Sequence, residues 1–461
     1  MPHSLKIACL GWLPLAAIST FAGPAPNAAK PSGEPVLEAP TLHSLGVHWI
    51  IAGDDNQNAV VQVAWRTRGG PWRDGAPLLR VERGAHKPEG NPGSVAVPAD
   101  AWLFAGSNAG GTHDVWFEGL TIRRAQWAFV AHEAARIVVR HCHIHDTEYG
   151  ITATRNDHDT LRGWFVTDNL IEGPSVWPRS IGIENARGVQ ISGEGHVIAY
   201  NRVRRFADAI DTFPSPRCCA IDIHNNEISE CTDDGIELDY SERNVRCFHN
   251  RLTDVFQGIS VQPIYGGPAY AFRNALYNVI QEPFKMHNSP SGALFFHNTC
   301  VKQGMPLVLQ TSDRVRNCVS RNNLFIGTAA RYAYETTAPM IDCDFDYDGF
   351  GGGPWEMFLK WNDQRYKTLD EVRSKAPAYR HAVLVTSGPA PPDDPAKKHE
   401  PADLRLPPGC SAIDAGEKLV GFNGDFAAGS PDLGAYELGE PLPHYGPRPH
   451  QPARPLIQPD F

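Results

Sequence analysis

The chain has 461 residues, 42% of them hydrophobic, and a formal net charge of −10. A chain of this length and apolar content can bury a large core, so we expect one large elongated domain and a smaller one. No run of lysines and arginines is present. The charge therefore argues against nucleic acid or an anionic membrane as the main partner, and a neutral or cationic ligand is easier to hold.

The N-terminus reads as a secretory signal peptide over residues 1–22. Lys6 is its only charge, an apolar run covers residues 7–21, and Ala22 ends a stretch with small residues at both cleavage determinants. Residues 23–35, rich in Pro and Ala, are expected to form a linker, and no later stretch is apolar enough to span a bilayer. We therefore expect a secreted or periplasmic protein.

The cysteines do not indicate a specific disulfide framework or metal site. Removing Cys9 with the signal leaves nine of the ten cysteines, so at least one is unpaired in a monomer. No CxxC motif and no Cys/His spacing of zinc type is present. Most of the cysteines stand in apolar strand-like contexts, where cysteine usually acts as a small hydrophobe.

Residues 36–83 alternate apolar and polar side chains, as in VVQVAW and PLLRV, with turn signals at 54–56 and 68–70. This pattern predicts a few antiparallel strands with polar outer faces. The segment is similar to the fibronectin-type β module that often precedes secreted β-helices. It is short for a full sandwich, so we expect it to cap the next domain.

From Asp114 onward the sequence repeats. An asparagine recurs at intervals of 25, 24, 24, 24 and 25 residues, and Asn169 and Cys142 extend the series upstream across an insertion. The members are Asn201, Asn226, Asn250, Asn274, Asn298 and Asn323. A steady period with no room for a helix in each unit is typical of a β solenoid. The asparagine amides should stack along its axis at one turn.

A second column keeps the same period and is formed by the triplets GIT, GIE, AID, GIE, GIS, PFK and PLV. They start at residues 150, 182, 209, 235, 258, 283 and 306. The middle residue of each is apolar and should point inward, so its neighbours should point outward. At this point the chain resembles the right-handed parallel β-helix superfamily of pectin-lyase-like proteins. That resemblance implies an all-β fold with three parallel sheets over residues 101–438.

The repeat loosens past Gly327. Thr368 to Glu371 forms a capping box that predicts a short helix ending near Ala376. SAIDAG (411–416) and PDLGAYE (431–437) resemble the closing segment of secreted β-helix proteins. Residues 439–461 form a Pro-rich tail, expected to lie extended along the surface or to be disordered.

Acidic residues are concentrated between Phe206 and Tyr240. The ones that bear on the site lie within 32 positions: Asp208, Asp211, Asp233, Asp234, Glu237 and Asp239. Successive coils lie about 4.8 Å apart, so equivalent positions become neighbours. The alignment predicts three rows on one face. They are Asp208, Asp234, Gln257 and Glu282; then Glu184, Asp211, Glu237, Ser260 and Lys285; then Asp239, Gln262, His287 and Gln310.

This layout resembles the polygalacturonase-type glycoside hydrolases, whose coils carry NTD, DD, GHG and RIK in turn. Here FAD (206–208), Asp233-Asp234, FQG (256–258) and Lys285-Met286-His287 stand at those places, with Phe206 and Gln257 replacing the family's asparagine and histidine. The resemblance implies polysaccharide hydrolysis with Asp234 as acid and Asp208 with Asp233 activating water.

Substrate binding is predicted beside that group. Lys285 and His287 would hold a hydroxyl or carboxylate of the sugar, and Trp177, Tyr240 and Tyr265 would stack on sugar rings. Gln257, Gln262, Asp211, Glu237 and Asp239 complete the predicted substrate face. The expected partner is a polysaccharide or oligosaccharide, and hydrolysis needs no cofactor.

Other interpretations stay open. Asp in DDGI often caps backbone amides at a strand entrance. Asp211, Glu237 and Asp239 would suit Ca²⁺, and a calcium-dependent lyase would use Lys285 or Arg243 as base, with a uronate epimerase as a related possibility. The acidic face would also suit a non-catalytic glycan-binding surface. His141, His143 and His145 suggest a metal site, and residues 155–159 a loop lining the cleft.

Overall fold

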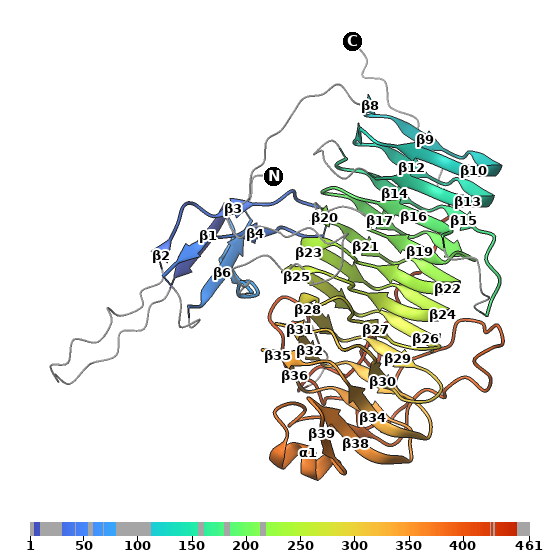
Figure 1. The fold of residues 1–461 in the computed structure, drawn as a ribbon. Coiled ribbons are helices and arrows are strands. Elements are labelled where there is room, and N and C mark those ends of the chain that lie inside the picture. The colour runs from blue at the N-terminus through green and yellow to red at the C-terminus, as the bar shows by residue number, and fades with distance from the viewer. Residues whose placement is uncertain are drawn as a thin grey trace.

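A computed structural model shows a parallel β-helix of about nine turns with a small β module at its side (Figure 1). It is almost entirely β, as predicted. The structure describes residues 4–9, 30–41, 43–53, 59–67, 69–79, 112–154, 161–178, 185–212, 218–424, 426 and 429–449. No helix among these residues is long and apolar enough to cross a membrane.

Each regular coil crosses three faces, which we call A, B and C in chain order. Face A is a 13-stranded sheet, and faces B and C belong to a 14-stranded sheet that bends at a corner. Face A contains β9 (Trp116–Glu118), β12 (Val138–Arg140), β14 (Phe165–Thr167), β17 (Val197–Ala199), β20 (Cys218–Cys219), β21 (Asp222–His224), β23 (Ser241–Phe248), β25 (Tyr265–Phe272), β28 (Ser291–Phe296), β31 (Val315–Arg316), β32 (Val319–Arg321), β35 (Met340–Ile341) and β36 (Asp344–Phe345).

Four long strands run through both B and C: β10 (Thr121–Ala131), β13 (His143–Ala153), β22 (Glu227–Glu237) and β24 (Arg251–Ser260). Face B also contains β15 (Leu170–Glu172), β18 (Arg202–Arg204), β26 (Ala275–Val279), β29 (Thr299–Val301), β33 (Leu324–Ile326), β37 (Gly349–Gly351) and β40 (Val383–Val385). Face C also contains β16 (Arg187–Ile191), β19 (Asp208–Asp211) and β27 (Phe284–Lys285). Strands on each face pair in parallel with the next coil.

The asparagine column forms the corner between faces A and B, as predicted. Asn250 Nδ2 donates to Asn274 Oδ1 at 3.0 Å and to the Ile223 carbonyl at 2.9 Å. The same pattern repeats in every coil from Asn169 to Asn323, where Asp348 accepts from the last asparagine. Backbone groups that a tight corner would leave unpaired are thus satisfied in the buried interior.

The corner between faces B and C depends on small residues. A Cβ at Gly258 would lie 2.3 Å from the Pro283 carbonyl oxygen, and one at Gly150 would lie 2.3 Å from the Gly188 oxygen. In the triplets that begin at Gly150 and Gly258, the first residue therefore approaches the next coil, rather than pointing outward as predicted. The middle residues stack inside, as in the succession Ile210, Ile236, Ile259.

The register corrects one triplet. Val189 pairs with Ile210 and Gln190 with Asp211, so GVQ (188–190) precedes AID in the stack. The aligned GIE at 182–184, including Glu184, lies outside the described residues, and its predicted place in the stack is taken by β16. The insertion between Asn169 and Asn201 displaced the alignment by six residues.

The last coils are less regular. A four-stranded sheet contains β30 (Leu307–Leu309), β34 (Ala330–Thr336), β38 (Trp355–Trp361) and β39 (Gln364–Tyr366). Helix α1 (Leu369–Lys375) follows, with Thr368 accepting from the Glu371 amide, so the predicted capping box is confirmed. It closes the end of the β-helix drawn at the bottom of Figure 1.

Residues beyond 400 fold back along face B. A second hydrophobic cluster joins Leu404, Leu406, Leu433 and Tyr436 to outward residues of face B such as Leu324. Further along, the His444 carbonyl accepts from Asn225, and Arg448 pairs with Asp168. The described part of the Pro-rich tail thus lies extended along the β-helix.

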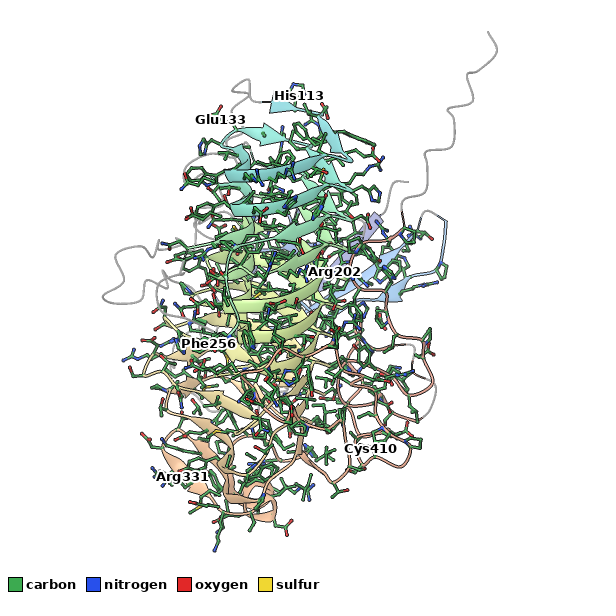
Figure 2. All side chains as sticks on the ribbon, turned by 90° about the vertical axis from the view of Figure 1, so that its right-hand side faces the viewer. His113, Glu133, Arg202, Phe256, Arg331 and Cys410 are labelled. Carbon is green, nitrogen blue, oxygen red and sulfur yellow. The ribbon has the colours of Figure 1, made fainter. Side chains whose placement is uncertain are left out.

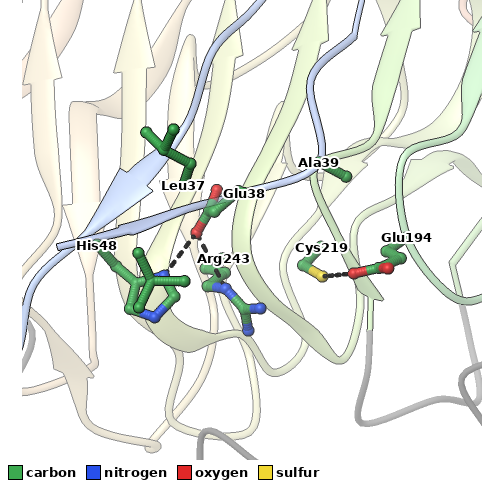
Figure 3. Close-up of a pocket in the computed structure, with 8 residues that line it drawn as sticks. Leu37, Glu38, Ala39, His48, Glu194, Cys219 and Arg243 are labelled. Carbon is green, nitrogen blue, oxygen red and sulfur yellow. Dashed lines mark hydrogen bonds and ion pairs between the residues drawn. The ribbon is translucent and has the colours of Figure 1, made fainter. Parts of the chain in front are cut away.

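The N-terminal module packs on face A. It contains β2 (Lys30–Pro31), β3 (Val36–Leu37), β4 (Val47–His48), β5 (Ile51–Ala52), β6 (Val61–Arg66) and β7 (Arg73–Asp74), with β8 (Thr112–His113) and β11 (Ala134–Ala135) pairing at the entrance to the β-helix. Its described strands form two- and three-stranded antiparallel units. Figure 3 shows Glu38 of the module paired with Arg243 at 3.0 Å beside His48.

The segment predicted as a signal peptide includes β1 (Ser4–Cys9), which pairs antiparallel with β6. Its removal on export stays a prediction. The nine cysteines from Cys142 to Cys410 have free thiols, and eight of them are buried. They pack as small apolar residues, as their sequence context indicated.

Candidate functional site

Face C brings the acidic residues together in the predicted register. Asp211, Glu237, Ser260 and Lys285 follow one another on successive coils. Asp234 lies opposite Gln257, and its backbone amide donates to Asp208 Oδ1 at 2.8 Å. The predicted alignment of these residues on successive coils is therefore confirmed from Asp208 onward. Figure 2 shows the side chains over the stack, with Phe256, the neighbour of Gln257, at one edge.

Three of these carboxylates form a compact cluster. One oxygen of each of Asp208, Asp234 and Glu237 lies within 4.8 Å of the other two. Asp208 and Asp234 are fully buried, and Glu237 is 8% exposed. Such a group carries unfavourable like-charge repulsion unless protons or cations offset it. We call these three residues the carboxylate cluster.

Two basic residues flank the cluster. The Arg187 guanidinium pairs with Asp208 through Nη1 and with Asp211 through Nε at 3.1 Å. Lys285 Nζ lies 2.7 Å from Asp234 Oδ2 on the other side. Burial alone would lower the pKa of both groups, but the neighbouring carboxylates outweigh it and raise the pKa of Arg187 and of Lys285.

Burial has the opposite effect on the acids, because it disfavours their charged form and so raises the pKa. Burial raises the pKa of Glu237 well above its ordinary value, and Asp208, Asp211 and Asp239 raise it further. Burial also raises the pKa of Asp208, against the effect of Arg187, and that of Asp239 to about 8. Several raised pKa values thus occur together on face C, a pattern that is common at functional sites.

Sequence reasoning missed Arg187. Its register partner is Asp208, a member of the carboxylate cluster. The signal was present in RGVQI (187–191), an alternating strand with a basic first residue. The repeat alignment instead predicts that GIE at 182–184 precedes AID (209–211) in the stack, which leaves Arg187 out of the predicted row.

The predicted calcium set of Asp211, Glu237 and Asp239 needs correction. Asp211 accepts from Gln190 at 2.8 Å as well as from Arg187. Asp239 Oδ1 accepts from Ser260 at 2.7 Å and from the Gln262 amide at 2.6 Å. The carboxylate oxygens that lie within 4.8 Å of one another belong to Asp208, Asp234 and Glu237, so Glu237 is the member of the predicted set that lies in the cluster.

Other predicted residues have structural roles. Gln257 accepts from the Glu282 amide at 2.8 Å and donates to Gln281 at 2.9 Å, which ties two coils together. His287 pairs with Glu282 at 3.1 Å, away from the cluster. Asp233 lies at a register shift between Cys231 and Asp234, half-buried, and is not part of the cluster.

The aromatic predictions are wrong for two of three residues. Trp177 is only 4% exposed, and its indole donates to the Lys397 carbonyl. Tyr265 is also 4% exposed, packed against Tyr240 with ring centroids 6.2 Å apart. Neither offers a ring face to a sugar. Tyr240 alone is half-buried and keeps the prediction open.

The remaining candidates lie elsewhere. Arg243 pairs with Glu38 on face A, so it cannot serve the cluster on face C. His143 and His145 have rings 4.6 Å apart but bond to Glu172 and Asp146, respectively, and His141 precedes the strand at the asparagine corner. Residues 155–159 lie outside the described part of the chain.

Comparison with known proteins agrees with the fold. The family model for the right-handed β-helix region matches residues 105–274, which include the carboxylate cluster. No curated protein and no solved structure gives a significant match. The structure is therefore a parallel β-helix, and residues 105–274 match the right-handed β-helix region, which is consistent with the resemblance to pectin-lyase-like proteins.

Proposed function

We propose that this protein is a polysaccharide lyase that cleaves uronate-containing chains by β-elimination and depends on calcium. Asp208, Asp234 and Glu237 would hold the cation, and Lys285 would act as the base. The carrying observation is the cluster of three buried carboxylates within 4.8 Å of one another, with the Lys285 ammonium 2.7 Å from one of them. Proteins of this fold family often act on polysaccharides, although some are not enzymes.

The local charge balance supports a cation. Face C gathers five buried carboxylates, Asp208, Asp211, Asp234, Glu237 and Asp239, around two basic side chains, Arg187 and Lys285. If all were ionised, the site would carry three uncompensated negative charges. Burial makes such an excess costly, and a divalent ion would offset most of it.

The donor set also fits calcium. Ca²⁺ prefers carboxylate oxygens at about 2.3–2.6 Å, so two ligand oxygens on one ion lie up to roughly 5 Å apart. The cluster oxygens meet this limit. In addition, Asp234 Oδ1 is buried without a hydrogen-bond partner among the described residues. An oxygen of this kind would bind a cation without losing an existing bond.

The chemistry assigned to the chain is proton transfer. Lys285 would take the proton next to the uronate carboxylate, the C–O bond to the leaving sugar would break, and a carbon–carbon double bond would form. The leaving oxygen would take up a proton. Calcium, when bound, supplies positive charge that neutralises the uronate carboxylate and makes the neighbouring C–H more acidic.

Lys285 must be neutral to act in this way. Its carboxylate neighbours raise its pKa, so in the cation-free protein it is held charged against Asp234. Neutralising these carboxylates removes the cause of that shift. The proposal therefore couples the basicity of Lys285 to occupancy of the cluster.

Hydrolysis is the second candidate, because the raised pKa of Glu237 would keep a carboxylic acid protonated beside ionised neighbours. The geometry suits it less well. Inverting glycosidases separate their carboxyl groups by about 6.5–9.5 Å to admit a water, and retaining ones by about 5–5.5 Å, whereas the cluster oxygens lie within 4.8 Å of one another. Moreover, Asp234, the acid expected from the sequence, faces the Lys285 ammonium.

The two reactions leave different products. Purified protein is incubated with polygalacturonate, alginate and neutral plant polysaccharides, and both reducing ends and ultraviolet absorbance of an unsaturated product are followed. We expect absorbance to rise on a uronate polymer, to stop with a chelator and to return with calcium. New reducing ends without absorbance, unaffected by the chelator, would identify a hydrolase, and binding without any product a glycan-binding protein.

Site variants test the residue roles. Glu237→Gln is expected to abolish the increase in melting temperature that calcium gives to the wild type, which at 100 times Kd corresponds to about 2.7 kcal/mol. Lys285→Met is expected to reduce kcat at least about 100-fold while calcium still stabilises the protein. Lys360→Met is the matched control, because Lys360 is buried and pairs with Glu335 in the distant four-stranded sheet.

A further inference from the structure

Face C carries an aromatic pair that continues the row of the carboxylate cluster. Trp127 in β10 pairs in register with Tyr149 in β13, Tyr149 with Arg187 and Arg187 with Asp208. The four positions thus form one row along the β-helix axis. At about 4.8 Å per coil, Trp127 lies three steps, roughly 14 Å, from Asp208.

The two rings form a preorganised unit. Their centroids are 5.2 Å apart and their planes differ by only 14°, so they stack. Trp127 is nevertheless 44% exposed, and Tyr149 is half-buried. By contrast, Asp208 in the same row is fully buried. The row therefore passes from a buried charged cluster to an exposed aromatic surface.

We propose that Trp127 and Tyr149 form a sugar-binding subsite for the same polysaccharide chain that is cleaved at the carboxylate cluster. This inference rests on the proposed function. The apolar faces of a pyranose ring pack well on aromatic rings, and a rigid stacked pair loses little entropy on binding. Beside it, Gln126 Nε2 donates to Glu148 Oε2 at 3.2 Å, which places further hydrogen-bonding groups at the rim.

The geometry also sets the direction of the bound chain. The row runs parallel to the axis through β10, β13, β16, β19 and β22, which Figure 1 shows as successive rungs. A polymer that reaches both ends of the row must lie along face C across the coils. The two stacked rings are uncharged, so they recognise the sugar ring, whereas recognition of the uronate carboxylate belongs to the cluster.

Kinetics on substrates of increasing length test the subsite. For Trp127→Ala we expect KM for polygalacturonate, or whichever uronate polymer the wild type cleaves, to rise about tenfold. The rise should shrink as the oligosaccharide is shortened toward a trimer. Trp127→Phe should restore most of the affinity, because it keeps an aromatic ring. An unchanged KM on the polymer, or an equal effect on the trimer, would overturn the subsite.

A matched control distinguishes an effect specific to the position of Trp127 from the general effect of removing an exposed tryptophan. Trp116 is 62% exposed in β9 on face A, outside the row. Trp116→Ala should leave KM unchanged, and an effect equal to that of Trp127→Ala would contradict the proposal. Thermal unfolding of each variant verifies that it is folded.

Binding distinguishes this proposal from the proposed function. Affinity electrophoresis in gels containing polygalacturonate or alginate measures binding without turnover. If the wild type cleaves no polymer but is retarded, and Trp127→Ala is retarded less, the subsite stands and the lyase proposal fails. If the wild type cleaves and Trp127→Ala migrates and reacts as wild type, the subsite is wrong and the lyase proposal stands.

Discussion

At the scale of single residues, Arg187 is as important to the site as the acids are, because it pairs with two of them. It lies between Asp208 and Asp211 and is largely buried, its side chain 16% exposed. A buried carboxylate next to a guanidinium is tolerable, whereas one left alone is not. The acids were visible as a local excess in the sequence, but their partner came from the preceding coil.

Replacing Arg187 by Met should therefore destabilise the protein by about 3–5 kcal/mol, because two buried carboxylates would lose their cation. Urea denaturation at neutral pH measures the loss. Arg204→Met is the control, since Arg204 pairs with Glu172 while its side chain is 42% exposed, and it should cost less than about 1 kcal/mol. Equal costs would contradict the structural role of Arg187.

At the scale of elements, the asparagine ladder shows how a corner is repeated. Each residue before a ladder asparagine adopts a left-handed φ, as at Asn225 (53°) and His249 (50°). The amide that follows then bridges the coils above and below. The ladder ends at Asp348, whose Oδ1 accepts from the backbone and side chain of Asn323 at 2.8 and 2.9 Å.

This ladder end predicts a pH dependence. Burial raises the pKa of Asp348 to about 7, whereas an unfolded aspartate titrates near 3.9. As pH rises between these values, the unfolded state loses its proton first, so the wild type loses stability. Asp348→Asn, which extends the ladder with a neutral amide, should remove that loss and gain about 2–4 kcal/mol at pH 8 but little at pH 4.

Urea titrations of both proteins at several pH values verify this expectation. Asp370→Asn serves as control, because the Asp370 side chain is 95% exposed in helix α1 and its removal should leave the pH profile unchanged. A wild-type profile that is flat relative to Asp348→Asn between pH 4 and 8 would show that Asp348 is ionised throughout.

At the scale of the whole molecule, two segments distant in sequence cover two faces of the β-helix. The N-terminal module lies on face A, and the residues after 400 lie along face B (Figure 1). Face C, with the carboxylate cluster and the Trp127–Tyr149 pair, is not the face that either segment packs on. Within the described part of the chain, face C is therefore the face on which the proposed substrate would bind.

The packing of the C-terminal segment on face B can be tested by its contribution to the stability of the protein. Leu433 is fully buried in the second hydrophobic cluster, so Leu433→Ala should cost about 2–5 kcal/mol and speed proteolytic release of the C-terminal segment. Leu438 is 44% exposed, and Leu438→Ala should change stability by less than about 0.5 kcal/mol. Unfolding curves and time courses of limited proteolysis compare the two, and equal behaviour would contradict the packing.

The sequence by itself determined the solenoid, the asparagine ladder, the capping box and the acidic face, because each depends on a local pattern or a constant period. Neighbours one period apart must meet in a stacked coil, which is why Asp211, Glu237, Ser260 and Lys285 align as expected. Only the tertiary structure placed Arg187 beside Asp208, since an insertion breaks the period there. Likewise, the burial of Trp177 depends on a contact with Lys397, 220 residues away, which no repeat encodes.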